Sequence, residues 1–461
     1  MFAYMRRGKA FYRNVVTLAA PIVLQNLVTT ALGLCDTFMV GLLGEAPMAA
    51  VTLANLPIFV IQLLVFGIQS GSSVLISQYW GKRDTDTINR VIGIGIYVAG
   101  GISTLFALVM FFFPAQIMGM LTNNQELVEL SLGYCQLVGF SYIFNSITGV
   151  YVGAHRSMEN PRLGLCVFTA SMLLNTFLNW VFIFGNLGAP RLEVVGAAIA
   201  TLTSRIVEFV IMAVYALVNR RFRLKPRLLF CPGRLLLGDF VRYSTPVVMN
   251  ETLWGLGNSI YATIMGHMDQ STEILAAYTI SGNVEKIFTV LVFGVAGTAA
   301  IIVGREIGAG RKETVYEVGC ALNTLAVLVG VVMGGAMILL SRSPLGTAFY
   351  SLFHLSPWSA ATATMMLTFL GGVLPLRSFD TTNIVGVLRG GGDVRAATII
   401  DLSPLWFVAI PLAFLFGIVL KWGIFWVYVG LSMESVCKSF IGVWRLRSRR
   451  WINDLTRTDL E

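Results

Sequence analysis

Charged side chains and catalytically versatile side chains are both scarce in this sequence. Only 12% of its 461 residues are Asp, Glu, Lys or Arg, whereas 56% are hydrophobic. This composition excludes a water-soluble globular protein, because so few charged groups cannot cover its surface. The three histidines, His155, His267 and His354, lie too far apart in sequence to suggest a metal cluster, and no phosphate-cradling or nucleophile motif is present. We therefore expect no enzyme, no bound cofactor and no nucleic-acid partner.

The cysteines show no pattern of metal or disulfide chemistry. None of the six belongs to a CxxC pair, and most lie inside apolar runs, where cysteine acts as a small core residue. They stand at Cys35, Cys135, Cys166, Cys231, Cys320 and Cys437.

Long apolar segments follow one another along the chain. A hydrocarbon core about 30 Å thick needs about 20 mostly apolar residues per helix. A β-barrel is excluded because its strands alternate polar and apolar residues, whereas 91–113 and 326–340 are apolar on all sides. The sequence therefore predicts an all-α membrane protein with about twelve transmembrane helices. The predicted spans are 15–43, 48–79, 90–113, 127–152, 163–185, 194–218, 240–266, 274–304, 314–340, 358–388, 396–419 and 423–444.

Basic residues are distributed unevenly among the connections between these spans. Most lie in the two termini and in every second loop, whereas the other loops hold only Arg191, Arg342 and Lys421. Because basic loops stay in the cytoplasm, we expect a multi-pass protein of the plasma membrane, a bacterial inner membrane, with both termini cytoplasmic. The basic start, 1–13, precedes an apolar run without a small-residue cleavage site, so it predicts a first transmembrane helix and not a signal peptide.

The second half of the chain repeats the first. Leu64 to Gly67 recur as Leu291 to Gly294, an offset of 227 residues, and Pro21 and Pro246 differ by 225. Six spans in each half give a parallel repeat, whose interface is where transporters place a central cavity. The expected parts are an N-terminal six-helix lobe at 1–218, a basic cytoplasmic linker at 219–239, a C-terminal six-helix lobe at 240–444 and a cytoplasmic tail at 445–461.

Several local patterns resemble the multidrug and toxic compound extrusion (MATE) family along nearly the whole chain. The resemblance implies two pseudo-symmetric six-helix lobes in a V-shaped bundle. It also implies a monomer that exchanges cationic or amphipathic small molecules for sodium ions or protons and is surrounded by membrane lipid. The patterns are Ala20-Pro21, Cys35 to Gly41, Gln78 to Arg83, Asn175 to Gly185, Val195 to Thr201, Ser244 to Pro246 and Arg389 to Asp393.

Asp36 is the leading candidate for ion coupling. An ionised side chain in the hydrocarbon core costs roughly 2.5 to 3.5 kcal/mol, so it faces a cavity, a partner or an ion. Asp36 has no basic residue within a helical turn, so it is either protonated or paired with a bound cation. The alternative is that its carboxylate caps a neighbouring backbone.

Three neutral residues are expected to join Asp36. Asn175 and Asn179 share one helix face because they are four residues apart, and Thr201 offers a hydroxyl from the next span. In the resembled family these positions line the cation site of the N-terminal lobe, although many members carry a second aspartate where Asn179 stands. A single charge among neutral oxygens predicts one sodium ion or one proton and excludes a divalent-ion cage. The alternative is that Asn175 and Asn179 only form hydrogen bonds between helices.

The second half offers a possible second site. Glu251 and Asp380 match acidic positions that some members of the resembled family use, and Asp401 is the repeat counterpart of Asn175 at an offset of 226. Arg377 precedes Asp380 by three residues, near enough for an internal salt bridge that would neutralise this aspartate. The alternative is that Asp380 belongs to an ion site. In the first half, Arg205 and Glu208 are expected to pair.

The predicted function is ion-coupled export of small organic molecules. A flippase for lipid-linked oligosaccharides is the alternative within transport, but an anionic headgroup would favour an arginine-rich cavity. An intramembrane enzyme would need a catalytic pair, such as two spaced aspartates or a serine and a histidine on facing helices. The sequence does not decide between sodium and proton coupling.

Overall fold

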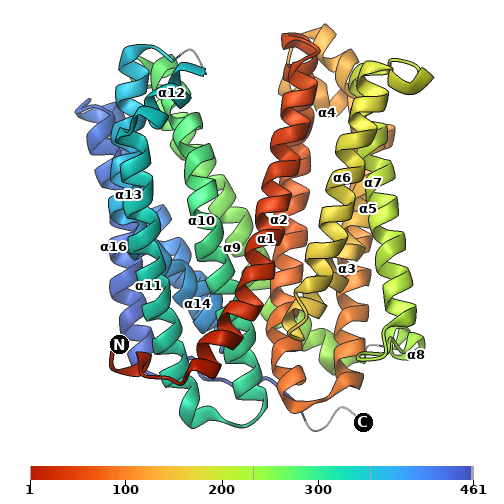
Figure 1. The fold of residues 1–461 in the computed structure, drawn as a ribbon, viewed down its shortest axis with the longest axis vertical. Helices are drawn as coiled ribbons and strands as arrows, with labels where there is room; N and C mark the ends of the chain where they lie inside the picture. The colour runs from red at the N-terminus through yellow and green to blue at the C-terminus, as the bar shows by residue number, and fades with distance from the viewer. Residues whose placement is uncertain (1, 232, 353–354, 458–461) are drawn as a thin grey trace. The chain divides into compact units, whose positions relative to one another are not determined.

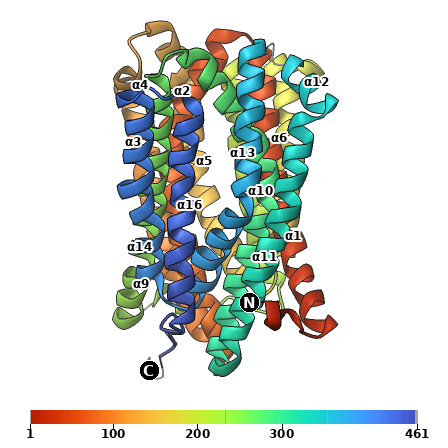
Figure 2. The same cartoon turned by 90° about the vertical axis from the view of Figure 1, so that its left-hand side faces the viewer.

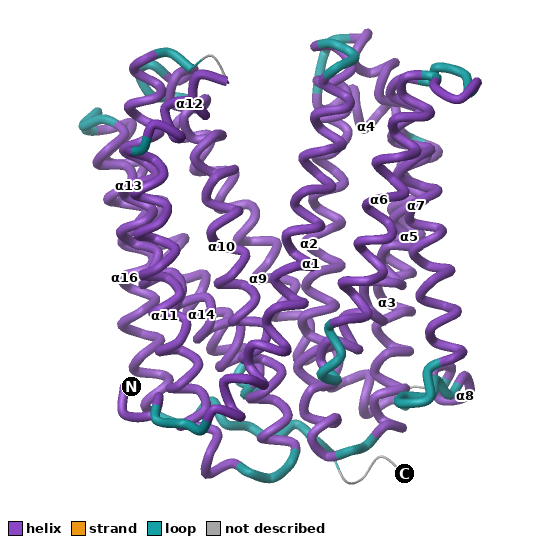
Figure 3. Tube along the Cα trace, viewed as in Figure 1, coloured by secondary structure: helices purple, strands orange, loops and turns teal. Residues whose placement is uncertain are grey.

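The apolar segments form long helices bounded by capping residues. The computed structural model describes residues 2–231, 233–352 and 355–457, and no strand occurs in this part of the chain (Figure 3). Asp84, Asn124 and Ser356 each accept a hydrogen bond from a backbone N–H of the first turn that follows, which satisfies donors that a helix start leaves unpaired. All twelve predicted spans coincide with helices, as expected for an all-α membrane protein.

Eleven helices in the described part of the chain are long and apolar enough to cross a membrane. The predicted span 240–266 lies in the helix that is missing from this set, α9 (Arg234–Gly266). Asp239, Arg242 and Glu251 interrupt its apolar residues. Its 33 residues are nevertheless more than the 20 or so that a crossing needs.

The chain divides into two compact units, and each unit change lies inside a helix. The N-lobe unit comprises Leu24–Val248 and a short piece that begins at Arg457, and the C-lobe unit comprises Met1–Val23 and Met249–Thr456. Helices α1 (Lys9–Gly41) and α9 therefore each contribute to both units. In both helices the change comes two residues after the repeat proline, Pro21 or Pro246.

In the N-lobe unit, α5 packs against α2, α3 and α7, and α6 packs against α7 (Figure 1). One apolar core lies among these helices and includes Ile58, Cys135 and Ala198. The helices of this unit besides parts of α1 and α9 are α2 (Glu45–Lys82), α3 (Thr85–Phe112), α4 (Pro114–Leu121), α5 (Gln125–Ser157), α6 (Arg162–Phe184), η2 (Asn186–Gly188), α7 (Glu193–Val218) and α8 (Pro226–Phe230).

In the C-lobe unit, α13 packs against α10, α11 and α16 (Figure 2). It is the repeat counterpart of α5, so equivalent helices occupy equivalent places in the two units. The helices here are η1 (Phe2–Met5), α10 (Ser271–Gly308), α11 (Lys312–Arg342), α12 (Pro344–Leu352), α13 (Pro357–Thr381), η3 (Thr382–Leu388), α14 (Val394–Pro404), η4 (Leu405–Ala409), α15 (Ile410–Phe414), η5 (Leu415–Val419) and α16 (Ile424–Arg447).

Paired close contacts show the internal repeat in three dimensions. A Cβ added at Gly67 of α2 would lie 2.6 Å from the Cα of Val248. At its counterpart Gly294 of α10, an added Cβ would overlap the side chain of Val23. Glycine lets α2 approach the backbone of α9 and lets α10 approach a side chain of α1. The recurring tetrapeptide seen in the sequence is thus a recurring helix contact.

The C-lobe unit departs from regular α-helix in three π-helical stretches, η3, η4 and η5. η4 begins directly after Pro404, and η5 follows Pro411 within the same helical stretch. Proline has no backbone N–H, so the helix loses a regular hydrogen bond and widens locally. Arg389 follows η3 directly, and Asp401 lies four residues before η4 begins.

Candidate functional site

The N-lobe unit brings the four predicted residues of the first site together. The Asn179 side-chain amide donates to Asp36 Oδ1 at 2.6 Å and to Asn175 Oδ1 at 3.0 Å. Asn175 Nδ2 in turn donates to Thr201 Oγ1 at 3.4 Å. The result is a chain of hydrogen bonds from α1 through α6 to α7 that ends on one carboxylate.

Charge within this cluster is concentrated on Asp36. Its side chain is half-buried, whereas Asn175 and Asn179 are buried. Among the described residues, no Lys or Arg lies within 4 Å of the Asp36 carboxylate. A carboxylate held by amides at a partly accessible place in a span is suited to receive a proton or a monovalent cation.

The Asn179 amide turns its nitrogen toward the carboxylate, and its oxygen has no partner among the described residues. The Nδ2 donates to Asp36, whereas the Oδ1 is buried and makes no hydrogen bond to any described residue, although both lone pairs of an amide oxygen can accept. Buried acceptors are normally satisfied. The cluster therefore contains an acceptor that its own side chains do not use.

Arg205 and Glu208 form the predicted ion pair on α7. Arg205 Nη1 donates to Glu208 Oε2 at 2.6 Å, and Glu208 is fully buried. The pair is neutral as a unit, so it leaves the carboxylate of Asp36 as the net charge in this part of the N-lobe.

Three carboxylates of the C-lobe unit, Glu251, Asp401 and Glu434, are paired with cations. Lys438 Nζ contacts Asp401 Oδ1 and Glu434 Oε1, both at 2.6 Å. Arg389 Nη1 contacts Glu251 Oε1 at 2.9 Å, and its Nη2 lies 3.9 Å from Asp401. Three acids and two bases therefore form one continuous network.

Neutral donors complete this network. The Asn250 amide donates to Asp401 Oδ2 at 2.7 Å, and the Tyr261 hydroxyl donates to Glu434 Oε2 at 2.9 Å. The Arg389 side chain is only 1% exposed. Buried charges with this degree of pairing and hydrogen bonding hold helices in register, and α9, α14 and α16 all contribute.

The predicted salt bridge between Arg377 and Asp380 is wrong. Arg377 pairs instead with Glu285 of α10, and Asp380 accepts a hydrogen bond from the Ser439 hydroxyl at 2.7 Å. Three residues of helix bring two side chains to the same face, but Arg377 is long enough to reach the neighbouring helix. Asp380 is 5% exposed, and its Oδ2 makes no hydrogen bond to a described residue.

Sequence reasoning missed Lys438, Glu434 and Arg389. Lys438 lies inside the predicted span 423–444, but the charge bias of the loops led us to group it with the basic tail. Arg389 appeared only as part of a glycine-rich motif. A usable signal was present, since Glu434 and Lys438 are four residues apart in an apolar helix. Of the histidines, His354 lies outside the described residues.

Comparison with known proteins agrees with these observations. The MatE family model matches residues 21–181 and 246–415, two segments that begin at the repeat prolines. The uncharacterized transporter YisQ of Bacillus subtilis is 26% identical over 447 residues, which cover 95% of each chain. The probable multidrug resistance protein NorM of Thermotoga maritima is 24% identical over 444 residues, 95% of this chain and 93% of that one.

A solved structure shares the fold. It is described as the outward-facing conformation of a multidrug resistance MATE family transporter of the MOP superfamily. The TM-score is 0.85 at 20% identity, with 97% of this chain and 98% of that chain covered. With its internal repeat, its apolar helices and a family match over both halves, the chain belongs to the MatE family of membrane transporters, the family that its sequence motifs resemble.

Proposed function

We propose that this transporter exports small organic cations or amphipathic drugs in exchange for a monovalent cation, either sodium or a proton, by alternating access. The observation that carries the proposal is the hydrogen-bonded cluster around Asp36, in which one carboxylate accepts from the Asn179 amide and forms no ion pair with any described residue. The names of relatives support the substrate class, because several are multidrug resistance proteins.

The coupling argument rests on differential affinity. An ion that binds one conformation more tightly than the other shifts the equilibrium between them, whereas an ion with equal affinity shifts nothing. The Asp36 carboxylate lies between α1 and α6. When a proton or a sodium ion neutralises it, the free-energy cost of keeping a charge within the span falls. Because α1 belongs to both compact units, a change at Asp36 acts on a helix that both units share.

The orientation in the membrane follows from charge. Basic residues gather in the termini and in alternate loops, so we place both termini in the cytoplasm of a bacterial cell, with the protein acting as a monomer in the plasma membrane. Cysteine substitutions at Arg6 and Arg449, tested with a membrane-impermeant thiol reagent, should react only from the cytoplasmic side.

One transport experiment tests coupling and substrate class together. The purified protein is reconstituted in liposomes that contain a fluorescent cationic dye, and a pH step or a sodium step is imposed in turn. We expect dye movement with one of the two gradients and none without a gradient. Equal dye movement in the absence of any gradient would contradict coupled exchange.

A further inference from the structure

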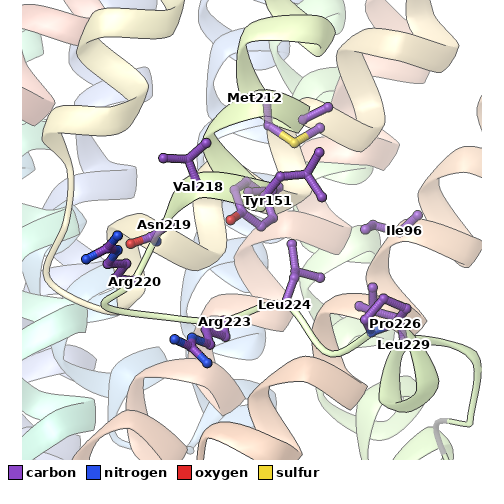
Figure 4. Close-up of a pocket in the computed structure, with 13 residues that line it drawn as sticks. Ile96, Tyr151, Met212, Val218, Asn219, Arg220, Arg223, Leu224, Pro226 and Leu229 are labelled. Atoms are coloured by element: carbon purple, nitrogen blue, oxygen red, sulfur yellow. The ribbon is translucent and has the colours of Figure 1, made fainter.

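A pocket of about 720 Å³ lies in the N-lobe unit, apart from the Asp36 cluster. Its wall comes from α3, α5, α7, the start of the basic linker and α8 (Figure 4). Such a volume is within the range of ordinary ligand sites, about 300 to 1,000 Å³. The residues used below are Tyr151, Asn219, Arg220, Arg223, Leu217 and Leu229, all of which line it.

The linker that forms one side of this pocket is fixed to α3 by backbone contacts. Asn89 Oδ1 accepts from the backbone N–H of Lys225 at 3.0 Å, and its Nδ2 donates to the Arg223 carbonyl at 3.3 Å. The Lys225 ammonium also contacts Asp86 at 2.5 Å. These contacts hold the segment before α8 in place, so the side chains of Arg220 and Arg223 start from a defined backbone.

The polar groups of the pocket are donors. The Tyr151 hydroxyl and the Asn219 Nδ2 are buried and make no hydrogen bond to any described residue. Arg220 and Arg223 are exposed, and within the described chain neither forms an ion pair. No acidic residue lines the pocket.

Figure 4 shows these donors on one side of the pocket. Arg220, Arg223 and Asn219 lie on that side together with Val218, and the Tyr151 ring stands between them and Ile96. Ile96 and Leu229 lie opposite. The pocket thus has a cationic side and an apolar side, the arrangement that an amphiphile with an anionic head would match.

An apolar strip on α7 continues from the pocket. Val210, Val214 and Leu217 occupy one face of the helix, and they are 50%, 55% and 87% exposed. A membrane-spanning helix presents such residues to lipid tails. A hydrocarbon chain that leaves the pocket would therefore remain in contact with apolar surface and would not cross water.

We propose that this pocket binds an anionic phospholipid of the leaflet that faces the basic linker. Arg220, Arg223, Asn219 and Tyr151 hold the phosphate, and an acyl chain lies along the strip of Val210, Val214 and Leu217. The transported organic cations are excluded here by charge. Since basic residues near the membrane attract anionic lipids, the linker serves as a lipid-binding element as well as a connection.

The test measures lipid binding to the purified full chain. Native mass spectrometry counts bound phosphatidylglycerol and phosphatidylcholine over a range of lipid concentrations. We expect phosphatidylglycerol to bind more tightly in the wild type. The double variant Arg220→Gln/Arg223→Gln should bind it at least about tenfold more weakly, because each guanidinium loses a charge-assisted hydrogen bond to the phosphate.

Matched variants keep this test specific. Arg227→Gln/Arg234→Gln removes two exposed charges from the same linker but leaves the pocket intact, so it should bind phosphatidylglycerol as the wild type does. Tyr151→Phe removes one donor without a change in charge and should weaken binding several-fold. Equal losses in the two double variants, or equal binding of the two lipids, would overturn the proposal.

Inorganic phosphate separates a lipid from a soluble ligand. We expect millimolar phosphate to leave phosphatidylglycerol bound, since phosphate has no chain to contact the apolar strip. Displacement of the lipid by phosphate at these concentrations would assign the pocket to a free phosphate and overturn the lipid assignment.

Discussion

Asp36 and Asp401 are both acidic residues inside apolar helices, but their partners differ in kind. Asp36 is half-buried and accepts from the amide of Asn179. Asp401 contacts the ammonium of Lys438 and lies within 3.9 Å of the Arg389 guanidinium. In the N-lobe a neutral group accompanies the acid, whereas in the C-lobe two cations do.

This difference supports our proposal that the two lobes have different tasks. A carboxylate that already holds a protein cation gains little from a soluble ion, because the ion has to displace Lys438 first. A carboxylate whose hydrogen-bond partner is a neutral amide is stabilised by any monovalent cation that reaches it. We therefore propose that ion coupling lies in the N-lobe and that the charged network of the C-lobe connects its helices.

Removing the charge of Asp36 should have the largest effect. In Asp36→Asn the amide keeps the shape of the site but carries no charge. A proton or a sodium ion therefore has nothing to neutralise there. We expect gradient-driven dye export to fall to the level of protein-free liposomes while equilibrium dye binding persists. Asp269→Asn, an exposed aspartate outside the cluster, is the control for expression and should export normally. Driven export by Asp36→Asn would show that coupling lies elsewhere.

Removing Lys438 should act mainly on stability. Lys438→Met leaves Asp401 and Glu434 without their ammonium partner, and breaking a buried ion pair in this way costs about 3 to 5 kcal/mol. Thermal unfolding in detergent should show a lowered midpoint, with part of the loss recovered in Lys438→Met/Asp401→Asn because the two residues interact directly. An unchanged midpoint for Lys438→Met would mean that the network does not stabilise the lobe.

Removing the amide beside Asp36 should change the affinity of the site for its ion without abolishing export. Asn179→Ala takes away a hydrogen bond to a charged acceptor, an interaction worth about 1.5 to 3 kcal/mol. We expect the ion concentration for half-maximal export to change about tenfold or more, with the maximal rate largely kept. Asn186→Ala, in the loop after α6, should leave the ion concentration for half-maximal export unchanged. A complete loss of export at every ion concentration would give Asn179 a larger role.

Asp380→Asn should have the smallest effect. Asp380 is more buried than Asp36, and the Asn side chain retains an acceptor for the Ser439 hydroxyl. No ion pair is lost, because Arg377 contacts Glu285. Dye export is measured for Asp380→Asn and Asp36→Asn at equal expression, and the losses in the two variants are compared. A greater loss in Asp380→Asn would move the coupling site to the C-lobe.

Much of the fold could be predicted because membrane-spanning helices can be recognised in a sequence by their length and apolar composition. The spans and the repeat offset follow from local sequence, whereas the close contacts at Gly67 and Gly294 are seen only in the structure. The place where α1 and α9 change unit could not be predicted in this way. It depends on which neighbours pack against each half of a helix, and a hydropathy pattern carries no such information.

In the candidate sites, too, some contacts could be predicted from helix spacing and others depend on tertiary packing. Asn175 and Asn179 lie on one helix face by spacing alone, so their contact was predictable, and their family position suggested the contact with Asp36. The partners of Asp401, Asp380 and Arg377 depend on long side chains that reach between helices. Spacing predicted the pair of Arg205 with Glu208 correctly and the pair of Arg377 with Asp380 wrongly, because only tertiary packing decides which neighbour a long side chain reaches.

The most direct test compares the two lobes in a single transport assay. Dye efflux and ion influx are recorded together in liposomes that contain the wild type, Asp36→Asn or Lys438→Met/Asp401→Asn, the last of which removes one charge of each sign. We expect the double variant to retain dye efflux tied to ion influx and Asp36→Asn to show neither. Coupled efflux that survives in Asp36→Asn and disappears in the double variant would contradict it.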